Sequence, residues 1–249
     1  MNLGLGGKTA VIAGCDSGTE LAIAEGLAAE GVNLILASRD ADRLNNTLAR
    51  LKARYQVQVL GLYYDSLTGD GIEALAEKVN ASCAGIDILI SKVATISQSD
   101  CTAALRLARA LLPVMRRRPS AVVIQYAPLH DAQPLQYRQL HNTCRSVLKS
   151  VTAMLADELI FDNIRVTTLD PVLVAGIDPV SSELPGYRPV GNRHLTELCV
   201  FLCSDWANYT LNADCFISDG LLRQSPATAP TSPCWQVNFQ DRAAGSITN

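Results

Sequence analysis

The sequence lacks the cysteine patterns of a metal site or a redox pair. Its eight cysteines include no Cys-x-x-Cys pair. Cys199 and Cys203 lie one helical turn apart, but no second cysteine pair accompanies them, so packing in the core is favoured over metal binding. Buried, reduced thiols are typical of cytoplasmic proteins, and we expect no metal and a cytoplasmic location.

Segments for export, membrane insertion and nucleic-acid binding are also missing. Residues 1–5 have neither a basic region nor a long apolar region, so no signal peptide is expected. No apolar run is long enough to span a bilayer. A net charge of -3 gives no broad basic field for nucleic acid, and Arg116, Arg117 and Arg118 are interpreted as the C-terminal cap of a helix. We therefore expect neither a membrane nor a nucleic-acid partner.

The remaining pattern predicts an α/β protein. A chain of 249 residues that is 48% hydrophobic fits one such domain. Short apolar runs alternate with helical segments, which favours a doubly wound, seven-stranded parallel sheet of Rossmann type. Strands are expected at residues 9–13, 33–37, 57–63, 86–90, 121–125, 164–169 and 213–218. Helices are expected at residues 21–30, 41–55, 71–82, 101–117, 141–161 and 195–205.

The composition changes near the C-terminus. Residues 1–223 are predicted to form the single domain, and residues 224–249 form a tail that begins with a stretch rich in proline, serine and threonine. Such a stretch cannot build a core, so the tail is expected to be extended or disordered. The alternative is that Trp235, Val237 and Phe239 clip onto a neighbouring subunit.

Several motifs occur in a recognisable order. Residues 14–20 read GCDSGTE, residues 87–94 read DILISKVA, and residues 201–205 read FLCSD. Together they resemble the T-G-x-x-x-G-x-G, D-x-L-V-N-N-A-G and F-L-x-S-D motifs of the short-chain dehydrogenase/reductase (SDR) family. The resemblance extends from Leu5 to about Leu222, and it implies a Rossmann-like fold, a nicotinamide nucleotide site and subunits that assemble.

The resemblance assigns a set of cofactor positions. The expected cofactor is NADP(H), because Arg39 follows the second strand where an acidic residue would select NAD. Asp65 matches the family residue that meets the adenine. The alternatives are that Arg39 is only a solvated residue, that Asp65 is a helix N-cap, and that cofactor binding has been lost. The positions assigned to the cofactor are Gly14, Ser17, Gly18, Arg39, Asp65 and Ala94.

Two of these motifs carry unusual charges. Glu20 replaces the last glycine of the first family motif, where it is expected to place a negative charge beside the pyrophosphate. Lys92 stands at the second asparagine of D-x-L-V-N-N-A-G. It is interpreted either as a new cation in the cleft or as a surface lysine that extends into solvent.

The family's catalytic side chains are substituted as well. Counting back from Ile164 puts His141 at the tyrosine position and Arg145 at the lysine position, and Asp100 falls at the asparagine position. The serine position falls at Ala127 or Pro128. The family tyrosine exchanges a proton with the substrate and the lysine lowers its pKa, so this relay is predicted to be missing.

Three functions remain open, of which the last is a nucleotide-sensing module in which Arg39 and Asp65 bind NADP(H) without turnover. The first is an inactive or supporting subunit that assembles with a related SDR chain, or with itself, in a dehydrogenase or reductase. The alternative is an enzyme in which His141 is the acid or base and Arg145 holds an anion. That enzyme would be an NADP(H)-dependent carbonyl or alcohol oxidoreductase, or a non-redox isomerase or cyclase. Whether the chain is an enzyme is left undecided, and the substrate is unknown.

Overall fold

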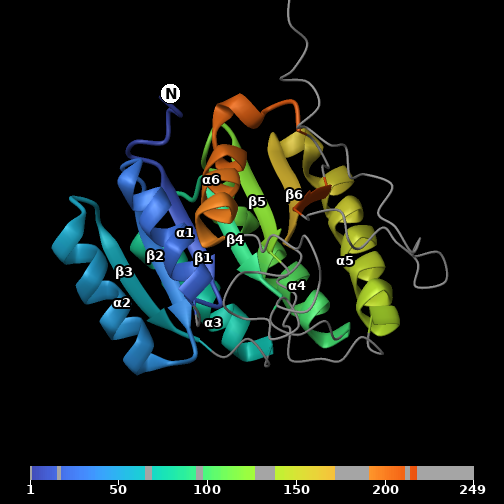
Figure 1. Ribbon diagram of the computed structural model, residues 1–249, viewed down its shortest axis with the longest axis horizontal. Coiled ribbons are helices and arrows are strands. Elements are labelled where there is room, and N and C mark those ends of the chain that lie inside the picture. Colours follow the sequence, from blue (N-terminus) through green and yellow to red (C-terminus); the bar gives the residue numbers. More distant parts are fainter. Residues whose placement is uncertain are drawn as a thin grey trace, which may run out of the picture.

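The computed structural model describes residues 2–15, 18–64, 69–93, 98–126, 138–171, 191–210 and 214–217. Helices and strands alternate along these residues (Figure 1). In chain order they are β1 (Thr9–Ala13), α1 (Gly18–Ala29), β2 (Asn33–Ser38), α2 (Ala41–Arg54), β3 (Val59–Tyr63), α3 (Gly69–Ser82), β4 (Ile88–Lys92), α4 (Gln98–Met115), β5 (Ala121–Tyr126), α5 (Arg138–Leu159), η2 (Ile160–Asp162), β6 (Ile164–Pro171), α6 (Asn192–Cys203), η4 (Asp205–Ala207) and β7 (Asp214–Ile217).

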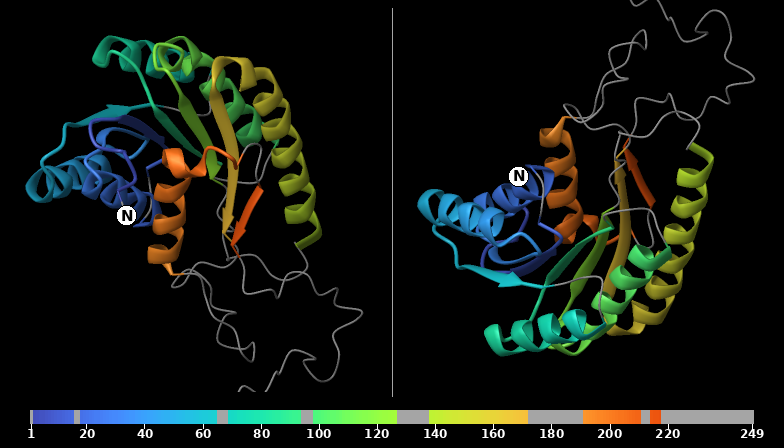
Figure 2. Two further views of the ribbon diagram at one scale, coloured as in Figure 1. Left: turned by 90° about the horizontal axis from the view of Figure 1, so that it is seen from above. Right: turned by 90° about the horizontal axis from the view of Figure 1, so that it is seen from below.

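The strands form one seven-stranded sheet in the order β3-β2-β1-β4-β5-β6-β7. Every neighbouring pair is parallel. Figure 2 shows α1, α2 and α6 on one face of the sheet and α3, α4 and α5 on the other. This arrangement confirms the predicted doubly wound, Rossmann-like fold, and it places the change of strand order between β1 and β4.

Strand β1 explains why the sheet must be covered on both faces. All five of its residues are buried. Ala10 and Ile12 belong to the hydrophobic cluster that includes residues of α1 and α6. Val11 and Ala13 belong to a second cluster that includes residues of α3, α4 and α5. Because successive side chains of a strand point to opposite faces, a continuous apolar run fits only a strand with helices on both sides.

Three element boundaries differ from the prediction in ways that affect the candidate site. Helix α1 begins at Gly18 instead of residue 21, so Glu20 lies in its first turn. Strand β4 is shifted and extends to Lys92, because Ser91 and Lys92 keep pairing with residues of β5. Helix α4 begins at Gln98, which puts Asp100 in its first turn.

The arginine cluster after α4 pairs with specific neighbours and does not simply cap the helix. Helix α4 ends at Met115, before the three arginines. Arg116 forms an ion pair with Asp162, in which Nη2 and Oδ2 are 2.7 Å apart. Arg118 donates a hydrogen bond to the carbonyl oxygen of Gly85. These contacts connect the end of α4 to η2 and to the segment before β4.

The described helices include none that is long and apolar enough to cross a membrane. The predicted tail at residues 224–249 and the boundary at residue 223 lie outside the described residues. Cys199 and Cys203 lie in the buried cluster around α6, as the prediction of core packing required.

Candidate functional site

The glycine turn lies at the carboxyl edge of the sheet, beside the change of strand order. Gly14 directly follows β1 and has φ +83°, a conformation that favours glycine. Its backbone N–H donates to the carbonyl oxygen of Ala37 in β2 at 3.0 Å. Gly18 opens α1, and a Cβ added there would meet no atom within 4 Å. A glycine turn that leads into a helix N-terminus at this place is suited to bind a phosphate.

The side chain of Glu20 points into the protein and not into the solvent beside the glycine turn. Its residue is only 1% exposed, and its carboxylate lies against β4. The prediction that Glu20 places its charge beside the pyrophosphate is therefore wrong for the described structure. The reason is that a side chain on this face of the first turn of α1 points toward the sheet.

Lys92 is the partner of Glu20. The Lys92 Nζ and Glu20 Oε1 atoms are 3.1 Å apart, and the lysine side chain is 6% exposed. The interpretation of Lys92 as a surface lysine is therefore wrong, because the sheet face that carries Lys92 is covered by α1. Charged side chains are rarely this deeply buried unless they are paired, as these two are.

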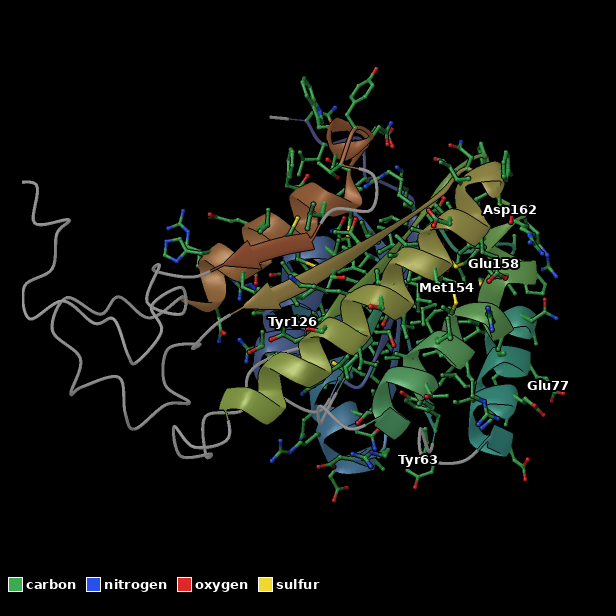
Figure 3. All side chains as sticks on the ribbon, turned by 90° about the vertical axis from the view of Figure 1, so that its right-hand side faces the viewer. Tyr63, Glu77, Tyr126, Met154, Glu158 and Asp162 are labelled. Carbon is green, nitrogen blue, oxygen red and sulfur yellow. The ribbon has the colours of Figure 1, made fainter. Side chains whose placement is uncertain are left out.

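Tyr126 packs beside this ion pair. It is the β5 residue in register with Lys92, and it is labelled in Figure 3. Its side chain is fully buried. Burial, followed by the charge of Glu20, raises the pKa of Tyr126 well above its ordinary value. Thr19, next to Glu20, donates a hydrogen bond of 3.2 Å to the side chain of Asn192 in α6. Tyr126 is therefore part of the buried packing beside the ion pair, and its hydroxyl is not exposed at the edge of the site.

Arg39 lies at the same edge of the sheet. It directly follows β2, whose Ala37 is in register with Ala13 of β1. The Arg39 side chain is exposed, and it makes no hydrogen bond or ion pair with any described residue. The neighbouring Asp40 caps α2 by accepting a hydrogen bond from the backbone N–H of Arg43. Arg39 is therefore available to bind an anion.

The three candidate catalytic positions lie on two neighbouring helices. His141 and Arg145 are four residues apart in the continuous helix α5, so they lie on the same side of that helix. Asp100 lies in the first turn of α4, which packs against α5. The description of these three residues covers the backbone alone, so the contacts of their side chains remain predictions.

Several predicted positions are not among the described residues. These are Ser17, Asp65 and Ala94 of the cofactor set, and Ala127 and Pro128 at the serine position. The described cofactor positions Gly14, Gly18 and Arg39 do lie at one edge of the sheet. The sequence motifs present Glu20 and Lys92 separately, so they do not predict that the two residues form an ion pair or that Tyr126 lies beside them.

A cavity and a pair of buried cysteines lie elsewhere among the described residues. A cavity of about 370 Å³ lies at the opposite edge of the sheet, where Asp87, Ala121 and Ile164 precede or begin their strands. The parts of the chain with a structural description contain no group of histidine, cysteine and acidic residues that could hold a metal ion. The hydrogen bond to Cys203, followed by burial, raises the pKa of Cys199, which therefore stays a thiol.

Comparison with known proteins identifies the family. The sequence profile described as short chain dehydrogenase matches residues 8–178. An uncharacterized oxidoreductase of Staphylococcus saprophyticus is 28% identical in an alignment of 183 residues, and the match covers 67% of this chain and 78% of the relative. Dehydrogenase/reductase SDR family member 4 of Oryctolagus cuniculus is 24% identical over 245 residues, which cover 87% of this chain and 94% of the relative.

Solved structures give the same answer with greater coverage. L-sorbose reductase from Gluconobacter frateurii, in complex with NADPH and L-sorbose, is 34% identical and superposes with a TM-score of 0.79. The match covers 90% of this chain and 100% of the reductase. An NADP complex of Pseudomonas aeruginosa RhlG has a TM-score of 0.77 at 24% identity, and this likeness supports the fold alone.

Proposed function

The chain belongs to the short-chain dehydrogenase/reductase family, and from this premise we propose that it is an NADP(H)-binding member without the usual proton relay. Its proposed role is that of a supporting subunit in an assembly with an SDR oxidoreductase. The observation that carries the proposal is the inward orientation of Glu20. This orientation leaves the glycine turn available to a phosphate, although the family motif is broken there.

Two further observations support NADP(H) as the ligand. Arg39 presents an exposed guanidinium, without a hydrogen bond or ion pair to any described residue, at the edge of the sheet that carries the glycine turn, where it could bind the 2′-phosphate. The L-sorbose reductase that is 34% identical is itself complexed with NADPH. In this proposal Gly14 and Gly18 would hold the pyrophosphate, and a bound NADPH would carry a hydride that this chain does not itself transfer.

The supporting role follows from the residues at the catalytic positions. By the family's spacing, His141 and Arg145 replace the tyrosine and lysine, and Tyr126 is fully buried, so its hydroxyl is not exposed to a substrate. Arginine cannot lower the pKa of a tyrosine that is absent, and it does not exchange its own proton near neutral pH. A chain of this kind would bind the cofactor and leave the chemistry to a partner.

We therefore expect the purified chain to oxidise no NADPH with L-sorbose or with a panel of other ketones and aldehydes. The measurement is the loss of NADPH absorbance over time, and His141→Gln should give the same trace as the unaltered chain. Robust turnover that His141→Gln abolishes would contradict the supporting role.

Such turnover would instead favour an enzyme that uses His141. The observation behind this alternative is that α5 runs unbroken through His141 and Arg145 and places them on one side. An imidazole with a pKa near neutrality can act as acid or base, and a neighbouring guanidinium can hold a carboxylate, phosphate or enolate. Both a carbonyl reduction and a cofactor-independent isomerisation are compatible with this pair.

We propose that a row of exposed apolar side chains on α5 is the surface that meets a partner subunit. Val147, Val151 and Met154 follow one another at helical spacing on its outward side, and Val147 and Met154 are 40% and 50% exposed. One turn further on, Glu158 forms an ion pair with Arg109 of α4 at 2.7 Å (Figure 3). Exposed apolar side chains in a row favour burial against another subunit.

Met154→Arg is expected to convert the assembled protein to monomers, because it inserts a charge into this apolar stripe. Light scattering after size-exclusion chromatography measures the mass, and circular dichroism should show an unchanged fold. Asp157→Arg introduces the same side chain beside the stripe and serves as the control. An unchanged mass for Met154→Arg would exclude this face of α5 from the interface.

A further inference from the structure

The Glu20–Lys92 ion pair is enclosed by the protein. Glu20 lies in the first turn of α1, and Lys92 is the last residue of β4. With side chains that are 1% and 6% exposed, the pair is sealed from solvent, unlike the Lys8–Asp205 pair, whose side chains are 23% and 62% exposed. A buried pair of this kind holds both charges in fixed positions, since neither can be solvated by water.

The lysine reaches Glu20 by passing the glycine turn. A Cβ added to Gly14 would lie 3.0 Å from the Cβ of Lys92 and 3.5 Å from its Cδ. The adjacent residues Ala13 and Ser91 are in register between β1 and β4. The aliphatic part of Lys92 therefore packs directly against the first glycine of the turn, and its ammonium group lies beneath the first turn of α1.

The location of the pair matters for an anion. The N-terminus of a helix attracts negative charge through its free N–H groups and its dipole. An unpaired carboxylate in the first turn of α1 would compete with a phosphate for this attraction. The ammonium group of Lys92, 3.1 Å away, cancels the charge of Glu20, and the buried Tyr126 beside it adds none.

We propose that Lys92 is a positioning residue for the pyrophosphate of the cofactor, and that it acts through Glu20. Lys92 keeps the Glu20 carboxylate inside the protein, and the ion pair that they form has no net charge. The glycine turn thereby retains its affinity for phosphate. This inference rests on the proposed binding of NADP(H), and it treats the two unusual residues as one unit in which each substitution compensates for the other.

The test compares two small probes at one temperature at which all variants are folded. Inorganic pyrophosphate reports on the glycine turn, and adenosine 2′-phosphate reports on the Arg39 end of the site. Titrations are followed by the NMR amide shifts of Gly14, Gly18 and Arg39. Lys92→Met is expected to weaken pyrophosphate binding by roughly tenfold or more, because it leaves a carboxylate near the anion. It should leave the adenosine 2′-phosphate affinity within about twofold.

The double variant Glu20→Gln/Lys92→Met separates an indirect role from a direct one. We expect it to restore pyrophosphate affinity to within about threefold of the unaltered chain, since no charge then remains. Lys8→Met, which breaks the exposed pair at the opposite edge of the sheet, is the matched control and should change neither affinity.

Three results would overturn the inference. If Lys92→Met weakened the binding of both probes equally, Lys92 would have a general structural role. A double variant as weak as Lys92→Met would show that the ammonium group itself binds the phosphate. Absence of pyrophosphate binding by the unaltered chain would remove the anion site. Pyrophosphate binding that depends on the pair, without NADPH binding, would instead support the inference and contradict the proposed function.

Discussion

Lys92→Met is expected to lower the free energy of unfolding by roughly 3–5 kcal/mol, because it leaves the Glu20 carboxylate buried without its counter-ion. The carboxylate cannot simply turn to water, since Glu20 is 1% exposed and lies between α1 and β4. The double variant Glu20→Gln/Lys92→Met should recover most of this loss, since it removes both charges together. Urea denaturation of the unaltered chain, the two single variants and the double variant measures the coupling.

The exposed pair of Lys8 and Asp205 provides the comparison. Its Nζ and Oδ1 atoms are 3.0 Å apart, nearly the same distance as in the buried pair. Lys8→Met should cost less than about 1 kcal/mol, because water solvates the remaining carboxylate. If Lys92→Met costs no more than Lys8→Met, the Glu20–Lys92 pair is not buried as described.

Arg39→Ala is expected to raise the dissociation constant of NADPH by roughly ten- to a hundredfold and to leave that of NADH nearly unchanged. The reason is that the guanidinium can form a charge-assisted hydrogen bond only with the 2′-phosphate, which NADH lacks. Arg39 has no other partner among the described residues, so its removal should leave stability intact. Calorimetric titration with NADPH and with NADH gives the ratio of the two dissociation constants for each variant.

Arg50→Ala is the matched control for this variant. Arg50 is also an exposed arginine, but it lies further along α2 and forms an ion pair with Glu25 at 2.8 Å. Arg50→Ala should change the dissociation constant of neither nucleotide. Equal weakening of NADPH and NADH by Arg39→Ala would contradict recognition of the 2′-phosphate.

The fold could be predicted from the sequence because short apolar runs alternate regularly with helical segments along the chain. The central strands β1, β4 and β5 are short, largely apolar runs that are buried along most of their length. A helical segment lies between successive strands, as a parallel sheet requires. The boundaries were harder to predict where a strand ends in polar residues. Ser91 and Lys92 read as a loop, yet both continue the pairing of β4 with β5.

The candidate site was only partly predictable. The motif gave the place of Gly14 directly after β1 and of Gly18 before the following helix, and their role as cofactor residues stays a prediction. The orientation of Glu20 was not predicted correctly, because a sequence motif states which residue follows the turn and not which way its side chain points. The opposite charges of Glu20 and Lys92 could have suggested the pair, since the order of the strands places β1 beside β4 and so brings their ends together.

The proposed assembly surface on α5 was likewise only partly predictable from the sequence. The sequence predicted a helix that includes Val147 and Met154, and the structure confirms it as part of α5. Which of its apolar residues stay exposed depends on how α5 packs against α4 and β6, and that packing is a property of the whole fold. The identity of a partner subunit depends on a second sequence and cannot be read from this one.

Calorimetric titration of the purified protein with NADPH tests the central claim most directly. Saturable binding of one NADPH per chain is the predicted result, and it would mean that the turned-in Glu20 leaves a working cofactor site. If the protein releases or absorbs no heat of binding even at high NADPH concentrations, the chain is not an NADP(H)-binding member of its family, and the proposed function is contradicted.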